Sequence, residues 1–84
     1  MYELIIGDDA MSFLEKLPNE TAKRIFKKIQ ETKENPHRYF IRLVGSKGYK
    51  LRVGDYRIIA DIEDNELKIL ILHIDHRKNA YKRI

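Results

Sequence analysis

The amino-acid sequence predicts a single α+β domain in which two helices cover an antiparallel sheet. The first observation is a pair of alternating apolar and polar runs that flank Gly54-Asp55, a dipeptide that reverses a chain in two residues. The second is a pair of helical periodicities before this hairpin, each with one apolar stripe that needs a surface to cover. The third is the order strand, helix, helix and consecutive strands, which is typical of an α+β layer.

The chain is expected to begin with a strand and a short helix. Residues 2–6 are apolar and β-prone, and Gly7 ends this strand. Asp8 or Asp9 is then in place to cap a helix that runs to about Lys16. The strand could join either edge of the sheet.

A second helix is expected to follow Pro18, which stops the first one. Asn19 is the predicted cap of this helix, and Asn35-Pro36 is its predicted end. The apolar stripes of the two helices are Ala10, Phe13, Leu14 and Leu17, and then Ala22, Ile25, Phe26 and Ile29. The two helices form an αα-hairpin, and the sheet is the only surface on which both stripes can lie.

The hairpin over residues 49–62 fixes its own pairing register. With a two-residue turn, Val53 faces Tyr56, Arg52 faces Arg57 and Leu51 faces Ile58. Side chains alternate across a strand, so one face carries Tyr49, Leu51, Val53, Tyr56, Ile58, Ala60 and Ile62. The other face carries Lys50, Arg52, Arg57, Ile59 and Asp61.

The remaining segments complete the sheet. Residues 37–39 are expected to be a connector, 39–44 a strand, 45–48 a loop and 63–65 a turn. Residues 66–73 form a nearly continuous apolar run, which predicts a strand near the sheet centre that is covered on both faces. The tail from His76 onward either adds a helical turn or stays extended.

Composition limits the classes of function. Eighty-four residues suffice for one domain, residues 1–84, and the absence of cysteine excludes disulfides and thiolate metal sites and fits a cytoplasmic protein. No apolar run is long enough for a membrane span, and the acidic N-terminus does not resemble a signal peptide. The net charge of +4 and the pI near 9.4 favour a polyanionic partner.

The cationic face of the hairpin is the most informative feature. Arg52 and Arg57 lie directly opposite each other with Lys50 close by, although like charges opposite each other in a sheet cost about 0.2–1 kcal/mol. A phosphate would supply a reason, because an Arg fork matches two phosphate oxygens. The alternative is a solvated strand face with its long side chains apart.

No metal or cofactor is expected. His73 and His76 are the only close pair of histidines, and three residues apart in a strand they point to opposite faces.

Two sequence lines resemble one family. Residues 51–59 (LRVGDYRII), followed some twenty residues later by His76-Arg77-Lys78-Asn79-Ala80-Tyr81, resemble the RelE/ParE superfamily of toxin–antitoxin toxins, and the resemblance covers essentially the whole chain. It implies a β-α-α-β-β-β domain. Toxins of the RelE branch are ribosome-dependent endoribonucleases that cut messenger RNA in the decoding site, whereas those of the ParE branch inhibit DNA gyrase. Both are held inactive by an antitoxin that wraps the toxin.

The resemblance also implies roles for individual residues. Arg57 would bind the scissile phosphate and its transition-state charge, with Arg77 as a second arginine near it, and Tyr81 would stack on a base or hydrogen-bond the attacking hydroxyl. His76 matches a histidine used as acid or base, because imidazole titrates near neutral pH. Lys50 matches a family lysine, and neighbouring cations favour its neutral amine, which makes it a candidate general base.

Other cations would contact RNA without taking part in the chemistry. Arg52 positions the backbone, and the further predicted RNA contacts are Lys47, Lys78 and Lys82. The chain departs from the family pattern at the upstream of two catalytic lysines, which falls on Gly48 or Lys47. Either Lys50 or His76 then serves as the base, or the enzyme is weakened.

The expected partners are a RelB-like antitoxin, the ribosome and messenger RNA, with no membrane and no small-molecule cofactor. The first two helices and the sheet edge should offer an apolar groove to an antitoxin helix. The alternatives are a ParE-like gyrase inhibitor and a weakened toxin that only binds its antitoxin. In both, the cationic face would meet acidic antitoxin side chains instead of RNA.

Overall fold

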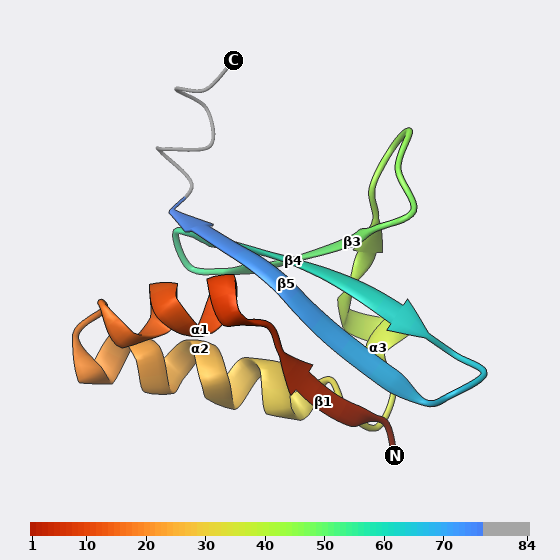
Figure 1. Cartoon of the computed structure of the whole chain (residues 1–84), viewed down its shortest axis with the longest axis horizontal. Helices are drawn as coiled ribbons and strands as arrows, with labels where there is room; N and C mark the ends of the chain where they lie inside the picture. The colour runs from red at the N-terminus through yellow and green to blue at the C-terminus, as the bar shows by residue number, and fades with distance from the viewer. Residues whose placement is uncertain (77–84) are drawn as a thin grey trace.

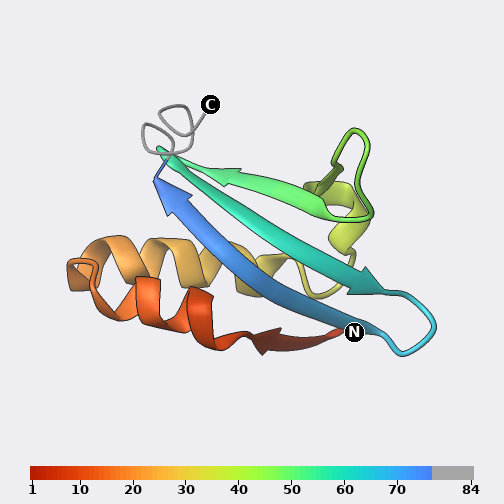
Figure 2. The same ribbon diagram turned by 45° about the horizontal axis from the view of Figure 1, so that its top comes forward.

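A five-stranded sheet with helices on one face forms the framework of the chain, and this computed structural model describes residues 1–76 (Figures 1 and 2). The strands lie in the order β1-β5-β4-β3-β2. The elements along the chain are β1 (Glu3–Ile6), α1 (Asp8–Glu15), α2 (Asn19–Glu31), α3 (Pro36–Tyr39), β2 (Ile41–Arg42), β3 (Tyr49–Val53), β4 (Tyr56–Glu63) and β5 (Lys68–His76). The predicted α+β class, with an N-terminal strand, two helices and consecutive antiparallel strands, is confirmed.

The β3–β4 hairpin has the predicted register. Arg52 pairs with Arg57, with Val53–Tyr56 and Leu51–Ile58 on either side of that pair. Gly54 has a φ of 58° and occupies the first central position of the turn, where a type II′ turn needs glycine. This turn fixes which side chains meet across the two strands.

β1 resolves the question of which edge the N-terminal strand joins. It pairs in parallel with β5, from Glu3 beside Lys68 to Ile6 beside Ile71. Gly7 then turns the chain into α1, and its amide donates a 2.8 Å hydrogen bond to the Ile71 carbonyl. α1 therefore starts next to the C-terminal half of β5.

Both long helices exist, but the predicted caps are wrong. Gly7 and Pro18 are the N-cap residues, Asp8 and Asn19 are already helical, and neither cap makes a side-chain hydrogen bond. Asp8 and Asp9 lie in the first turn of α1, where carboxylates still favour the positive end of the helix dipole.

The segment after α2 differs from the expectation. α2 ends at Glu31, four residues earlier than predicted, and the Thr32 hydroxyl donates a 2.6 Å hydrogen bond to the Ile29 carbonyl there. Pro36 begins α3, because proline suits the first position of a helix, so residues 36–39 are a helical turn. The expected strand over 39–44 is reduced to Ile41–Arg42.

β5 lies second from one edge and β4 is the central strand. The expectation that both faces of β5 are covered is wrong, because Leu72 is 48% exposed. The pairing of β4 with β5 shifts between Ile59 and Ala60: Ile59 pairs with His73 and Ala60 with Ile71. Leu72 is therefore the extra residue of a β-bulge.

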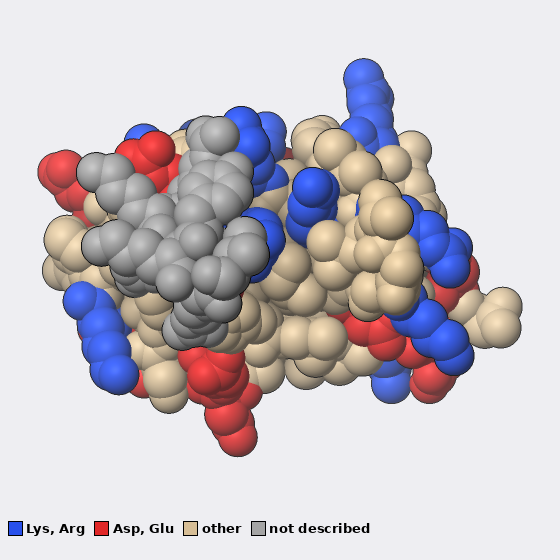
Figure 3. Space-filling view, turned by 90° about the horizontal axis from the view of Figure 1, so that it is seen from above, with Lys and Arg blue, Asp and Glu red and all other residues tan. Residues whose placement is uncertain are grey.

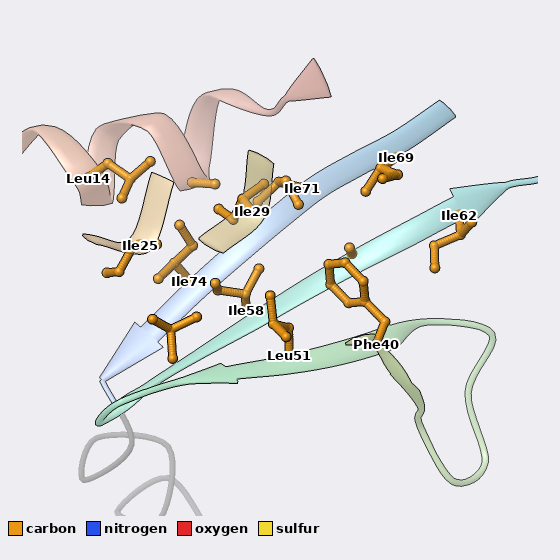
Figure 4. Close-up of a cluster of buried hydrophobic side chains, with 13 residues drawn as sticks. Leu14, Ile25, Ile29, Phe40, Leu51, Ile58, Ile62, Ile69, Ile71 and Ile74 are labelled. Carbon is orange, nitrogen blue, oxygen red and sulfur yellow. The ribbon is translucent and has the colours of Figure 1, made fainter. Parts of the chain in front are cut away.

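The core lies between the helices and the inner face of the sheet (Figure 4). Helices α1 and α2 contribute Leu14, Ile25 and Ile29, and the strands contribute Leu51, Ile58, Ile62, Ile69, Ile71 and Ile74, all buried. The side chains opposite these strand residues point away from the helices, which leaves the cationic residues on the outer face.

Candidate active site

The outer face of the hairpin carries the predicted cations. Lys50 and Arg52 are exposed, and Arg57 is directly opposite Arg52 with a side chain that is 43% exposed. Figure 3 looks onto this side of the molecule, where Lys and Arg side chains stand among mostly uncharged atoms. The sheet thus holds two guanidinium groups on neighbouring strands, an arrangement that can bind an anion between them.

Within the part of the chain that the structure describes, Arg57 has few close partners. Its Nη2 atom lies 3.7 Å from Oδ2 of Asp75, which makes an ion pair but exceeds hydrogen-bond length. Its Nε atom is buried and has no hydrogen-bond partner among residues 1–76. Because the side chain is 43% exposed and its ion pair with Asp75 is long, its outer N–H groups can bind an anionic ligand.

Asp75 is the buried carboxylate of this face. Its side chain is only 9% exposed, and its two oxygens face different partners. Oδ2 faces Arg57, and Oδ1 lies 2.8 Å from Nε2 of His73. A carboxylate buried this deeply needs paired cations, and these two side chains supply them.

His73 lies between two carboxylates. Its Nδ1 is 2.5 Å from Oδ2 of Asp9, on the first turn of α1, and its Nε2 faces Asp75. The hydrogen bond to Asp9 raises the pKa of His73 most, burial opposes this, and the hydrogen bond to Asp75 raises it further. Both carboxylates therefore favour the charged imidazolium of His73.

The bulge at Leu72 explains why His73 and Asp75 share a face with Arg57. In a regular strand, residues 69, 71, 73 and 75 would all face the helices. Because Leu72 is an extra residue, Ile74 is buried beside Ile58 on the helix side. His73 and Asp75 therefore lie on the outer face of the sheet. Sequence reasoning missed Asp9, His73 and Asp75 as site residues. The only signal was the interruption of an apolar strand by His73 and Asp75.

His76 lies on the other face of the sheet. It pairs with Tyr56, and the two rings meet edge to face with centroids 5.1 Å apart. The Tyr56 ring meets Phe13 of α1 in the same way, at 6.1 Å. Because side chains alternate along a strand, His76 beside Tyr56 and Arg57 lie on opposite faces at the end of the sheet. The catalytic role of His76 stays a prediction.

The other predicted site residues fall into two groups. Lys47 is exposed in the loop that joins β2 and β3, away from the paired arginines in sequence, and its RNA contact stays a prediction. Arg77, Lys78, Tyr81 and Lys82 lie outside the described residues.

Residues 1–76 contain no group of three or more His, Cys, Asp or Glu side chains placed to hold a metal ion. None of the helices described is both long and apolar enough to span a membrane.

A groove between α1 and α2 is the second feature that can bind a partner. Its floor is apolar and includes Met11 and Phe26, which are 41% and 40% exposed. Leu14 and Ala22 complete the apolar lining, and the charged side chains around it are Glu15, Lys23 and Lys27. The predicted groove is therefore present on the two helices, but the sheet edge expected to form part of it contributes no lining residue.

Residues 4–81 match the family model described as the ParE toxin of the type II toxin-antitoxin system, parDE. The chain belongs to this toxin family. A curated relative, the putative toxin RelE4 of Methanocaldococcus jannaschii, is 25% identical over 95 residues, which cover 99% of this chain and 94% of the relative. The resemblance to the RelE/ParE superfamily is confirmed, and the protein is a toxin of a toxin–antitoxin system.

Solved structures of the superfamily agree with the fold. The toxin-antitoxin complex RelBE2 from Mycobacterium tuberculosis contains a chain with a TM-score of 0.83 and 25% identity, over 90% of this chain and 98% of that one. A chain of the archaeal RelE-RelB complex from Pyrococcus horikoshii OT3 has a TM-score of 0.77 and 25% identity, over 90% of this chain and 94% of that one. The isolated E. coli RelE toxin has a TM-score of 0.77 and 22% identity, over 99% of this chain and 98% of that one. At this identity the match shows a similar fold.

Proposed function

We propose that this toxin is a metal-independent endoribonuclease of the RelE type, which cuts messenger RNA in the ribosomal A site and so inhibits translation in the cytoplasm. The observation that carries the proposal is the arginine pair on the outer face. Among residues 1–76, the buried Nε of Arg57 has no hydrogen-bond partner and its guanidinium makes only a long ion pair with Asp75. An unsatisfied guanidinium next to a second one suits a phosphate diester, which carries negative charge and two free oxygens.

The chemistry follows from what 2′-hydroxyl attack requires. The hydroxyl must lose its proton, the phosphorane must be stabilised, and the leaving 5′-oxygen must gain a proton. Arg57 stabilises the phosphorane charge, and Arg52 on the neighbouring strand holds the adjacent backbone. One of Lys50, on the same face, and His76, at the end of β5, accepts the hydroxyl proton, and the other donates a proton to the leaving 5′-oxygen. Arg77 and Tyr81 contribute as the family pattern implies.

A cleavage assay tests the proposal. Purified protein is added to an active translation extract, and message cleavage is mapped for the wild type, Arg57→Ala and Tyr81→Phe. Arg38→Ala is the matched control, because Arg38 is an exposed arginine on α3, outside the hairpin. We expect A-site cleavage by the wild type and the control, and a loss of about 10²–10³-fold for Arg57→Ala, the usual effect of removing one transition-state charge donor. Intact message with normal translation would contradict the proposal.

Gyrase inhibition is the second candidate, because the matching family model describes a ParE toxin. A supercoiling assay with purified gyrase separates the two functions. Inhibition of supercoiling in the absence of message cleavage would establish gyrase inhibition as the function. The arginine pair would then contact a protein instead of RNA.

The partner we propose is an antitoxin whose apolar helix lies in the groove between α1 and α2. The solved complexes of the similar toxins contain antitoxins, and Lys23 and Lys27 beside the groove favour an acidic helix. Phe26→Asp should weaken binding of the cognate antitoxin at least tenfold in calorimetry, because it removes an aromatic anchor and introduces a repelling charge. Leu67→Asn is the control, since Leu67 is also half-exposed but lies in the β4–β5 turn. Equal affinities for the two variants would exclude this groove.

A further inference from the structure

Four charged side chains from three elements form a continuous row that runs from the first turn of α1 to the outer face of the hairpin. Asp9 of α1 contacts His73 of β5, His73 contacts Asp75 of the same strand, and Asp75 faces Arg57 of β4. The successive separations are 2.5, 2.8 and 3.7 Å. The row alternates carboxylate and cation, and it ends at the arginine to which we assign the phosphate.

The geometry determines the protonation state of His73. Both of its ring nitrogens face carboxylate oxygens, which accept hydrogen bonds and cannot donate them when ionised. A neutral imidazole has only one N–H, so only the imidazolium satisfies both contacts. Asp75 therefore has a close cationic partner other than Arg57.

Asp75 is shared unequally between its two cations. Its oxygen nearest His73 is at hydrogen-bond distance, whereas its oxygen nearest Arg57 is 3.7 Å from Nη2. A carboxylate that pairs closely with a guanidinium competes with phosphate for the same N–H groups. The hydrogen bond from the imidazolium thus weakens the electrostatic attraction between Asp75 and Arg57.

We propose that His73, held by Asp9, is a positioning residue that engages Asp75 and thereby leaves Arg57 available to an RNA phosphate. The identity of the ligand as RNA rests on the proposed function, but the control of anion binding at Arg57 does not. With His73 charged, the row contains two carboxylates and two cations. With His73 neutral, it has a net negative charge and Asp75 turns to Arg57.

The proposal implies a direction for pH dependence. Among residues 1–76, the charged groups that face His73 are Asp9 from α1 and Asp75 from β5. Arg57 from β4 lies beyond Asp75, and Arg52 from β3 is opposite Arg57. The two carboxylates raise the pKa of His73, so the imidazolium persists above its ordinary range. Anion affinity at Arg57 should be full at low pH and fall as pH rises through the raised pKa of His73.

The test titrates inorganic phosphate, and separately a short 2′-O-methyl RNA, into the intact protein and follows the Arg57 Nε–H and His73 ring resonances by NMR. In the wild type we expect the affinity to drop roughly three- to tenfold as His73 loses its proton. His73→Gln should bind weakly at every pH, and His73→Arg should bind well at every pH. Asp9→Asn should move the drop in anion affinity to lower pH. The Asp9 side chain is 70% exposed, so this change should disturb packing little.

Matched variants keep the outcomes distinct. His37→Gln removes a histidine on α3 and should leave the phosphate profile unchanged. If His73→Gln and Asp9→Asn, each verified as folded, retain the wild-type affinity and pH profile, or if phosphate never shifts Arg57, the proposal is overturned. Because phosphate binding needs no ribosome, a normal profile without message cleavage refutes only the proposed function.

Discussion

Arg52 and Arg57 face each other across the hairpin, yet their surroundings differ. Arg57 has Asp75 beside it on β5 and a buried Nε, whereas Arg52 is exposed and opposite a like charge. Opposed like charges destabilise a sheet by about 0.2–1 kcal/mol, so the hairpin is less stable than it would be without this charge repulsion. A site that must bind an anion gives a reason for keeping both cations.

We therefore expect Arg52→Gln to stabilise the fold and weaken anion binding together. The free energy of unfolding in urea should rise by up to about 1 kcal/mol, because the repulsion with Arg57 disappears. RNA affinity should fall. Arg38→Gln removes the same charge from α3 and should change stability by less than about 0.5 kcal/mol. A loss of stability in Arg52→Gln would show that the opposed pair is not repulsive.

The sequence predicted the cations of this site but not their carboxylate and imidazole partners. Lys50, Arg52 and Arg57 could be placed because a two-residue turn fixes the register of a hairpin by counting. Asp75 and His73 could not, because the bulge at Leu72 moves both to the other face and has no composition signal in an apolar run.

At the scale of the element, the two-residue turn of the hairpin depends on one backbone conformation. Gly54 has a φ of 58°, and a Cβ atom at this position would lie 2.4 Å from the Arg24 guanidinium of α2. The sequence predicted the turn but not that a helix side chain lies over it. Local rules likewise failed at Asn35-Pro36, where proline begins α3.

Gly54→Ala should lower the free energy of unfolding by about 1–2 kcal/mol, the cost of a left-handed residue that has a Cβ. Gly45→Ala is a matched comparison, because Gly45 has a φ of 73° but no atom within 4 Å of its Cβ position. Arg24 ends in a flexible side chain that can move aside, so the two variants should lose similar amounts, measured in urea. A much larger loss at Gly54 would mean that Arg24 is fixed against the turn.

Leu67 in the β4–β5 turn is a non-glycine residue with a left-handed backbone, so here a change to glycine is the test. It has a φ of 53°, which is unusual for a bulky residue, and it is 49% exposed. The sequence predicted the turn at residues 63–65, whereas the left-handed residue is Leu67. Leu67→Gly should raise the free energy of unfolding by about 1 kcal/mol in urea, because it relieves this strain and loses little burial. Destabilisation would mean that the Leu67 side chain makes packing contacts that outweigh the strain.

At the scale of the whole molecule, the topology joins distant parts of the chain. β1 pairs with β5 more than sixty residues away, and no local pattern in the sequence could reveal its edge or its parallel direction. A second long-range connection exists just before the start of β5. Oδ1 of Asp64 accepts a 2.7 Å hydrogen bond from the Tyr2 hydroxyl and lies 2.7 Å from Nε2 of His37. One carboxylate thus connects the β4–β5 turn, the start of β1 and helix α3.

This connection predicts how stability depends on acid. The hydrogen bond with His37, and next that with Tyr2, lowers the pKa of Asp64 below its usual 3.8. A group with a lowered pKa in the folded state stabilises the fold above its unfolded pKa, and this contribution is lost as pH falls through the folded value. The difference in unfolding free energy between wild type and Asp64→Asn should therefore be constant near pH 5 and shrink below about pH 4. Urea unfolding at a series of pH values measures it, with Glu66→Gln in the same turn as a control. A difference that stays constant into acid would show that the three segments are joined by packing and that the Asp64 charge adds nothing.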